Sequence, residues 1–441
     1  MNGLLKSSNW VAGVQWLFFI FTNIVIIPIT VGAAFGLPQE TIVMMLQMSF
    51  IVTGLACIIQ AWIGHRRPLM EGQSGLWWGV ILTLVNTAAA QGMPLQVLGG
   101  SLTLGIILSA VLTILIGITG LGPWIAKLFN STVMGVFMFL LGAQLVGIFL
   151  QGMLGIPFGN VEHVMIDPAV SLLSIAIAAL VIFVSIKAPA SMQKYSLLIG
   201  IVIGWIAFEL IFETESNYVQ PSFLSFELFP LGSLTWETGI ILTVILTGLL
   251  NTANTFGAIK GSDPIFHEEA SKKQYRNSFT ITGFVTGIAG IFGLVPYSPY
   301  VSSIGFLYQT GIFTRMPFML GGFLFFMMGV IPAVGAFFSG LPLSVGSAVL
   351  FVSYLQLVGS SFNFFKDVKW NTMNIYRIAI PLFVGLIIMT MPATYFNSLP
   401  GVIRPLVSNG LIVGITLALL MENVFNWDQI GTGNEEKREK T

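Results

Sequence analysis

The sequence predicts an all-α polytopic membrane protein with about fourteen transmembrane spans, arranged as a 7+7 inverted repeat. Its composition is 55% hydrophobic and only 8% charged, whereas a soluble domain carries about 25% charged residues. Apolar runs recur along the chain at the length of ~20 residues that a membrane helix needs. The third and the tenth of these runs are interrupted by polar segments.

The apolar runs give the expected spans in order. No Ala-x-Ala cleavage site follows the first run, so we expect that run to remain as a span and not to act as a signal peptide. Read with a window of about 20 residues, the spans are 10–32, 41–63, 69–90, 101–121, 126–150, 168–187, 196–213, 237–258, 278–294, 296–313, 317–338, 341–358, 376–392 and 403–421.

The charged residues predict the orientation of these spans. With the N-terminus in the cytoplasm, all of the 18 lysines and arginines except Arg404 fall on the cytoplasmic side. Cytoplasmic loops of membrane proteins carry such an excess of positive charge. Acidic residues such as Glu162, Glu213, Glu215 and Glu237 fall outside. We expect a multi-pass protein of the cell membrane, with both termini cytoplasmic and residues 425–441 as a polar tail.

Composition also excludes several classes of protein. The net charge is zero, which argues against a nucleic-acid partner. Cys57 is the only cysteine, and His65, His163 and His267 all lie in polar connectors. We therefore expect no disulfide, no metal site and no cofactor. A membrane enzyme or a receptor is the weakest hypothesis, because the sequence shows neither a catalytic triad nor a sensory domain.

The two interrupted spans predict a binding site. Residues 296–305 read PYSPYVSSIG and residues 68–75 read PLMEGQSG. Irregular backbone at membrane depth is tolerated only inside protein or beside a cavity. Spans 3 and 10 differ by seven, an odd number, so the second half runs in the opposite sense, and such paired breaks mark transporter sites. The alternative is that these small residues only serve helix packing.

At these residues the chain resembles the nucleobase–ascorbate transporter family, also called nucleobase:cation symporter-2. Residues 302–311, SSIGFLYQTG, keep Gly305, Thr310 and Gly311 at the spacing of the tenth-span motif of that family. Residues 72–74, GQS, resemble its third-span Gly-Ser-Ser. Residues 250–258, LNTANTFGA, resemble the eighth-span segment with its key acid. The subgroup that looks most similar contains uracil, xanthine and purine permeases.

The resemblance implies a division into two bundles. A core bundle of spans 1–4 (residues 1–123) and 8–11 (236–340) would hold the substrate. A gate bundle of spans 5–7 (124–235) and 12–14 (341–424) would face it and mediate homodimer contacts. Short antiparallel β-strands would break spans 3 and 10. The substrate would lie between spans 1, 3, 8 and 10 and cross the lipid bilayer by alternating access.

The sequence departs from the family where the family has titratable groups. Asn251 and Ser302 stand at the positions of the two carboxylates, Trp16 stands at that of a histidine, and Thr255 stands at that of a second polar group. An Asn amide both donates and accepts hydrogen bonds, so Asn251 suits the lactam edge of a nucleobase. The alternatives are an interhelical hydrogen bond for Asn251 and an interfacial anchor for Trp16.

Further substrate contacts are expected at both breaks. Backbone N–H groups of Val301, Ser302 and Ser303 would bind a carbonyl oxygen, because the start of a helix leaves such groups unpaired. Gln73 and Ser74 would face them from span 3. Trp16, Trp77 or a nearby Phe would stack on the ring, since aromatic faces accept any base.

Proton coupling has one candidate, Glu71, beside the break in span 3. A lone intramembrane carboxyl is a functional candidate, but Glu71 lies four residues after Arg67 and could simply pair with it. Three readings of transport follow: a proton-coupled nucleobase permease, an uncoupled nucleobase facilitator, or an anion transporter of the same architecture. Facing helix N-termini without carboxylates suit an anion.

Overall fold

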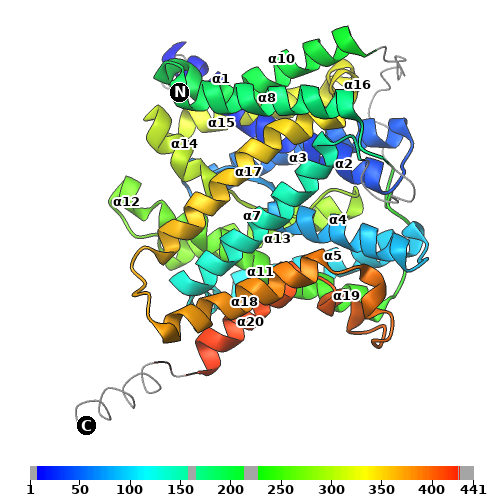
Figure 1. Cartoon of the computed structure of the whole chain (residues 1–441). Coiled ribbons are helices and arrows are strands. Elements are labelled where there is room, and N and C mark those ends of the chain that lie inside the picture. Colours follow the sequence, from blue (N-terminus) through cyan, green and yellow to red (C-terminus); the bar gives the residue numbers. More distant parts are fainter. Residues whose placement is uncertain (1–6, 157–164, 213–226, 426, 428–441) are drawn as a thin grey trace.

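The chain folds into a bundle of α-helices, which a computed structural model describes for residues 7–156, 165–212, 227–425 and 427 (Figure 1). The part up to residue 212 contains α1 (Ser7–Ile24), α2 (Ile26–Ala34), α3 (Gln39–Trp62), β1 (Glu71–Gln73), α4 (Gly75–Ala90), α5 (Leu95–Thr119), α6 (Gly122–Ala126), α7 (Ser131–Met153), α8 (Pro168–Lys187), α9 (Ala190–Gln193) and α10 (Ser196–Ile211).

The remaining elements begin at residue 238. They are α11 (Thr238–Gly261), α12 (Asp263–Phe266), α13 (Lys272–Ile291), β2 (Tyr297–Pro299), α14 (Ser302–Thr310), α15 (Arg315–Val330), α16 (Pro332–Ser339), α17 (Leu343–Phe365), α18 (Thr372–Thr390), the 3-10 helix η1 (Ala393–Phe396), α19 (Arg404–Val407) and α20 (Gly410–Val424). Each of the expected spans contains at least one of these helices.

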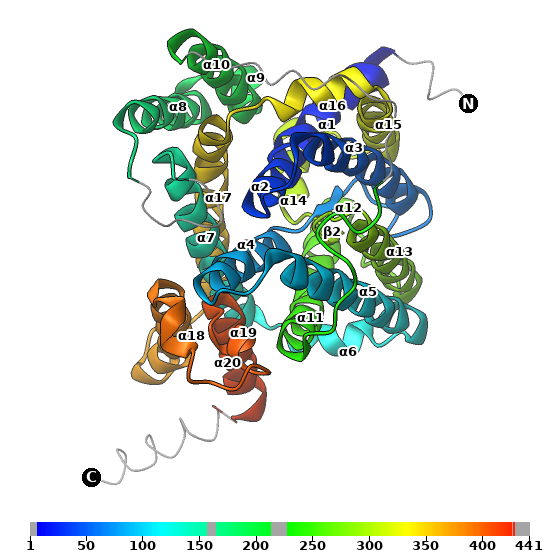
Figure 2. The same ribbon diagram turned by 90° about the vertical axis from the view of Figure 1, so that its right-hand side faces the viewer.

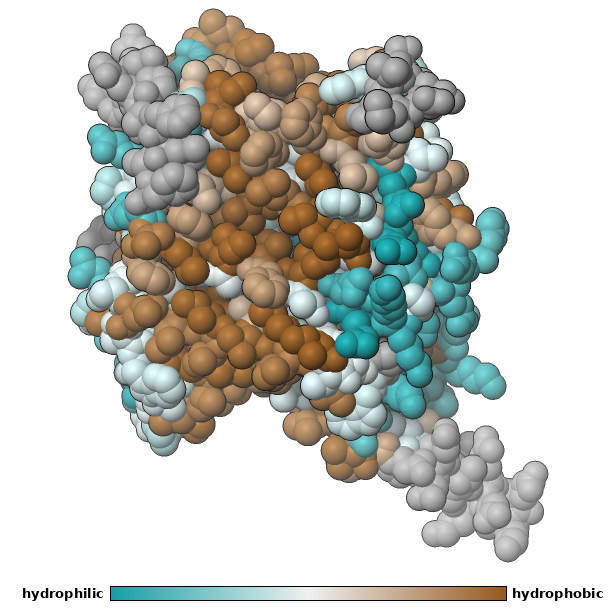
Figure 3. Space-filling view, turned by 180° about the vertical axis from the view of Figure 1, so that it is seen from behind, coloured by the Kyte–Doolittle hydropathy of each residue, from teal (hydrophilic) through white to brown (hydrophobic). Residues whose placement is uncertain are grey.

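Eight helical segments in the described residues are long and apolar enough to cross a membrane. The pair α14 and α15, bent by 117° at its break, adds a ninth if it is one span. The helices α4, α10 and α20 are apolar but shorter. A polytopic helical protein is therefore confirmed, while the count of fourteen spans and the inverted repeat stay predictions. Figure 3 shows the extensive apolar surface that such a protein presents to lipid.

The helices gather in two groups, which Figure 2 shows on opposite sides of the molecule. In one group α5 packs against α11 and α13, and α15 packs against α1 and α3. In the other group α17 packs against α7, α8 and α10, and α20 packs against α7 and α18. The assignment of these groups to a core and a gate bundle stays a prediction, and one of the contacts between the groups is that of α4 with α7.

Glycines bring the helices of the first group close together. A Cβ atom on Gly54 of α3 would lie 2.5 Å from the carbonyl oxygen of Gly322 on α15. A Cβ atom on Gly248 of α11 would lie 1.7 Å from the Ser109 hydroxyl oxygen on α5. Small residues at such crossings let membrane helices approach closely and gain dispersion contacts. Part of the high glycine content therefore serves packing.

Polar caps and one ion pair fix the helix ends of the second group. The side chains of Asn130 and Asp167 accept hydrogen bonds from the first turns of α7 and α8. Arg377 of α18 forms a salt bridge with Glu422 of α20, so Glu422 is a packing residue at the end of its span. Glu162, His163, Glu213 and Glu215 lie outside the described residues, as does the predicted tail apart from positions 425 and 427.

Candidate functional site

The two interrupted spans meet in a small antiparallel sheet. Strand β1 pairs with β2 in the register Glu71 to Pro299, Gly72 to Ser298 and Gln73 to Tyr297. The ladder continues beyond the strands, because the Ser74 N–H donates to the Pro296 carbonyl at 2.8 Å and the Tyr300 N–H donates to the Met70 carbonyl at 2.8 Å. These bonds satisfy backbone groups that helices cannot satisfy here. The expected short strands in spans 3 and 10 are confirmed.

A helix begins directly after each strand. Helix α4 starts at Gly75 with Ser74 as its N-cap, and α14 starts at Ser302 with Val301 as its N-cap. Neither N-cap side chain accepts a hydrogen bond from its own helix. Because the first turn of a helix has unpaired N–H groups and a partial positive charge, both helix starts favour acceptor atoms of a ligand. This arrangement matches the helix N-termini that the sequence predicted beside the two breaks.

Asn251 joins the two breaks from α11. Its side-chain Oδ1 accepts a hydrogen bond from the Ser74 hydroxyl at 2.7 Å, and its Nδ2 donates to the Tyr297 carbonyl at 3.0 Å. Since a backbone carbonyl can only accept, this second bond fixes the orientation of the amide. Asn251 is buried and makes the interhelical hydrogen bonds that were the alternative to substrate binding.

Asn254 belongs to the same network, although it was not among the predicted site residues. Its Nδ2 donates to Asn251 Oδ1 at 3.0 Å and approaches the Ser74 hydroxyl at 3.4 Å. It is half-buried, whereas Asn251 is buried. Its position three residues after Asn251 could have predicted this, because residues three apart share a helix face. Asn254 is therefore the more accessible of the two amides to a ligand.

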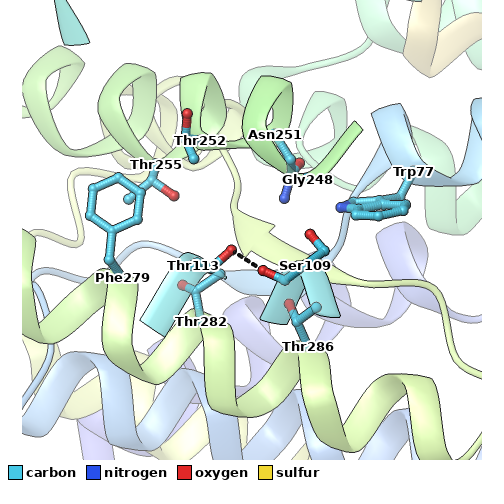
Figure 4. Close-up of a pocket in the computed structure, with 10 residues that line it drawn as sticks. All are labelled: Trp77, Ser109, Thr113, Gly248, Asn251, Thr252, Thr255, Phe279, Thr282 and Thr286. Carbon is cyan, nitrogen blue, oxygen red and sulfur yellow. Dashed lines mark hydrogen bonds between the residues drawn. The ribbon is translucent and has the colours of Figure 1, made fainter. Parts of the chain in front are cut away.

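A small cavity lies beside Asn251, between α5, α11 and α13. Its volume is about 10 Å³, which is room for about one water molecule. Threonines of α5, α11 and α13 supply hydroxyl groups to it, and Trp77 lies at one end with Phe279 at the other (Figure 4). The lining residues are Trp77, Ser109, Thr113, Gly248, Asn251, Thr252, Thr255, Phe279, Thr282 and Thr286. A nucleobase needs more room than this conformation gives.

The other predicted site residues fall in different surroundings. Thr255 lines the cavity one turn after Asn251. Trp16 is fully buried among phenylalanines, with ring centroids 4.5 Å from Phe306 and 4.7 Å from Phe318. Its indole N–H has no partner among the described residues. Trp16 is thus neither at a water interface nor in the cavity, and Trp77 is the tryptophan that faces Asn251.

Of the predicted site residues near the starts of α4 and α14, some make hydrogen bonds within the protein and others are accessible. The Ser303 hydroxyl accepts a hydrogen bond from the Met70 N–H at 3.0 Å, and the Ser303 N–H donates to the Tyr300 carbonyl at 3.1 Å. Gln73 is buried and donates through its Nε2 to the Ser49 hydroxyl. Ser302 is exposed and Val301 half-buried. Of the predicted group, Ser302 is therefore the most accessible to a ligand.

Glu71 occupies a separate polar pocket between β1, α3 and α13. It is fully buried. One carboxyl oxygen accepts a hydrogen bond from the Thr282 hydroxyl at 2.7 Å, and the other accepts one from Gln60 Nε2 at 3.2 Å. Both partners are neutral. Thr282 also lines the cavity beside Asn251, so Glu71 is one hydrogen bond away from it.

The alternative pairing of Glu71 with Arg67 is wrong, because Arg67 has other partners. Its guanidinium forms a salt bridge with Asp263 at 2.6 Å and donates to the Ile259 and Glu268 carbonyls. The backbone N–H of Arg67 donates to Nδ1 of His65, and burial together with the Arg67 charge lowers the pKa of His65 to about 3. His65 is therefore neutral at physiological pH.

Two helices that start from paired strands, within a bundle of apolar helices, define the membrane domain of a transporter. The transmembrane domain of the cyanobacterial bicarbonate transporter BicA shares this fold, with a TM-score of 0.64 and 14% sequence identity over 94% of this chain and 97% of that one. The anion transporter SLC26A9 superposes with a TM-score of 0.58, 12% identity, and coverage of 94% of this chain and 68% of that one. At such identities the likeness concerns the fold alone.

The chain belongs to the Permease family described by the Xan_ur_permease model, which matches residues 7–394. "Putative purine permease YwdJ" of Bacillus subtilis is 29% identical over 94% of this chain and 95% of its own length. The Bacillus subtilis uric acid permease PucJ is 24% identical over 93% and 91%, and the xanthine permease of that bacterium 20% over 96% and 95%. The family resemblance is confirmed, and the protein is a permease and not an enzyme.

Proposed function

We propose that this protein carries nucleobases across the cell membrane, with xanthine or a related oxopurine as the main substrate and uracil as a second candidate. The observation that supports this proposal best is the junction of Asn251, Ser74 and the Tyr297 carbonyl, where an amide meets the start of α4 and the strand β2 that precedes α14. The names of the similar proteins, which mention purines, uric acid and xanthine, point to the same class of substrate.

Recognition would use the amides of Asn251 and Asn254. A lactam edge presents one N–H donor beside one C=O acceptor, and an amide offers the complementary pair. When the pocket opens, Asn251 would exchange its hydrogen bonds with Ser74 and Tyr297 for hydrogen bonds with the substrate. The open N–H groups at the start of α14, next to Ser302, would receive a carbonyl oxygen, and Trp77 would stack on the ring.

Transport would follow from motion of the core bundle against the gate bundle, so that the pocket faces each side of the membrane in turn. The core would comprise residues 1–123 and 236–340, and the gate residues 124–235 and 341–424. Both termini would be cytoplasmic, and the gate would carry any homodimer contact. Glu71 would carry the coupled proton, because it is a buried carboxyl with neutral partners that lies near the cavity.

Uptake by reconstituted protein tests the substrate class. Purified protein in liposomes would be supplied with labelled xanthine and uracil, with and without an inward proton gradient. We expect accumulation of xanthine under the gradient. Equilibration that ignores the gradient would make the protein an uncoupled facilitator. Uptake of chloride, sulfate or bicarbonate in place of either base would favour the anion transporter.

Asn251→Ala tests the recognition site. We expect it to reduce uptake by about fivefold or more, since removing one partner of a buried hydrogen-bonded pair costs about 1–3 kcal/mol. Asn86→Ala is the matched control, because Asn86 is exposed on α4. Normal uptake by Asn251→Ala, at equal amounts of protein in the membrane, would remove Asn251 from the site.

A further inference from the structure

A second cavity lies at the ends of α5, α6 and α13. Its volume is about 210 Å³, and its lining includes Thr119, Gly120, Gly122, Lys272, Tyr275 and Arg276. It lies where α13 packs against α5 and α6, and the three helices lie side by side in Figure 2. Phe279 lines this cavity and the smaller one beside Asn251. This buried ring lies between the two spaces, so the second cavity is not part of the nucleobase site.

The residues that line the cavity include two cations and no carboxylate. Lys272 and Arg276 lie four residues apart on α13 and therefore share one face. Neither takes part in a salt bridge with another described residue, and no acidic side chain lines the space. Both are exposed. Two free cations at the rim of a concave site favour a ligand with negative charge.

A glycine forms the turn at the mouth of the cavity. Gly120 ends α5 with a φ of 74°, a left-handed conformation that favours glycine. A Cβ atom added there would lie 3.9 Å from Cδ of Arg276. Gly122, on the other side of Leu121, is buried against Phe279. The turn between α5 and α6 thus passes the cations without covering them.

An apolar surface continues from the cavity along the helices. On α5 Leu115 and Ile118 are 50% and 54% exposed, and on α13 Phe284 is 62% exposed. Next to the cavity, Trp124 of α6 is 65% exposed, as expected for a tryptophan at the interface between membrane and water. The cations therefore lie at the end of a lipid-facing surface, and the predicted orientation places them at the cytoplasmic side.

We propose that this cavity binds the headgroup of an anionic phospholipid, with its phosphate at Lys272 and Arg276 and its acyl chains along α5 and α13. Basic pockets between membrane helices on the cytoplasmic side are suited to such headgroups. Free phosphate would satisfy the two cations equally, but it would make no use of the apolar surface that leads away from them. The lipid accounts for both features.

Native mass spectrometry of the full-length protein tests the proposal. Phosphatidylglycerol and phosphatidylcholine would be titrated onto the wild type, onto the double variant Lys272→Gln/Arg276→Gln, and onto the control Lys366→Gln/Lys369→Gln. The control removes two exposed cytoplasmic charges outside the cavity. We expect one tightly held phosphatidylglycerol on the wild type. Affinity should fall by about fivefold for each cation removed from the cavity, about 25-fold in the double variant, and stay unchanged in the control.

A steric variant separates a bound lipid from diffuse attraction to charge. Thr119→Trp fills the space without changing the charge, and we expect it to weaken phosphatidylglycerol binding as well. Phosphatidylglycerol should raise the melting temperature of the wild type but not of these variants. Because each variant is compared with itself without lipid, this measurement reports binding even if a variant is less stable. Equal binding of phosphatidylcholine, or an equal loss in the control, would overturn the proposal. Displacement of the lipid by millimolar inorganic phosphate would identify a free-anion site in its place.

Discussion

At the scale of the residue, the carboxyl of Glu71 carries the main consequence for mechanism. The positions at which the resemblance implies carboxylates in the family hold Asn251 and Ser302, which do not titrate. We expect Glu71→Gln to abolish accumulation driven by a proton gradient while substrate exchange continues, because the amide keeps the size of the side chain and removes the proton carrier. Gradient-driven uptake and counterflow in liposomes measure the two activities separately.

Glu209→Gln is the matched control for Glu71→Gln, since Glu209 is an exposed acid on α10. His65 does not obscure the measurement, because its pKa of about 3 keeps it neutral across the pH range of transport assays. Any change of uptake between pH 5 and pH 8 must then come from another group. Full accumulation by Glu71→Gln would place the coupled proton elsewhere or make the carrier uncoupled.

At the scale of the element, the crossing of α5 and α11 positions Asn251. A Cβ atom on Gly248 would lie 1.7 Å from Ser109 Oγ and 2.9 Å from Ser109 Cβ, so a new rotamer of Ser109 alone does not relieve the contact. We expect Gly248→Ala to destabilise the protein by about 1–3 kcal/mol, the usual cost of overpacking. Heating in detergent followed by size-exclusion chromatography measures the loss.

Gly147→Ala is the control for the crossing, since nothing lies within 4 Å of a Cβ atom at Gly147 of α7. There the substitution should be neutral or slightly stabilising, because alanine is the better helix former. A Gly248→Ala protein as stable as this control would mean that α5 and α11 separate at little cost. The position of Asn251 would then depend on its hydrogen bonds alone.

The sequence was sufficient for the elements but not for their side-chain partners. Hydropathy located a helix in every expected span, and the residues PYSPYVSSIG and PLMEGQSG located both breaks, because proline and glycine act locally on the backbone. The partners of Arg67 and Glu71 depend on α11, α12 and α13, which lie about 200 residues further along the chain. The separation of only four residues along the chain suggested a pair of Arg67 and Glu71, and tertiary packing placed each with other groups.

At the scale of the whole molecule, the helix contacts come in pairs that exchange under a shift of seven spans. The contact of α5 with α13 corresponds to that of α15 with α3, and that of α11 with α5 corresponds to that of α1 with α15. In the other bundle the contact of α8 with α10 corresponds to that of α18 with α20. The strands β1 and β2 exchange with each other. A repeat of seven spans would produce these pairs, and the inverted sense of the second half stays a prediction.

If the two bundles move past each other, a link between them must stop transport. Gln144 of α7 donates to the Gly79 carbonyl at 2.8 Å and to the Thr83 hydroxyl at 2.6 Å, so α4 and α7 touch here across the proposed boundary between core and gate. We expect a reducible bifunctional thiol reagent to block uptake in the double variant Thr83→Cys/Gln144→Cys. The native Cys57 is fully buried and gives little background.

Reduction of the link should restore uptake, and each single-cysteine variant treated with the same reagent should keep its activity. The electrophoretic mobility of the treated protein reports the fraction that is linked, so that uptake can be compared at known extents of reaction. Uptake that persists in fully linked protein would mean that this boundary does not slide. Because a nucleobase does not fit the cavity of about 10 Å³ in the present conformation, another motion within the core, such as separation of α11 from α5 and α13, would then have to open the site.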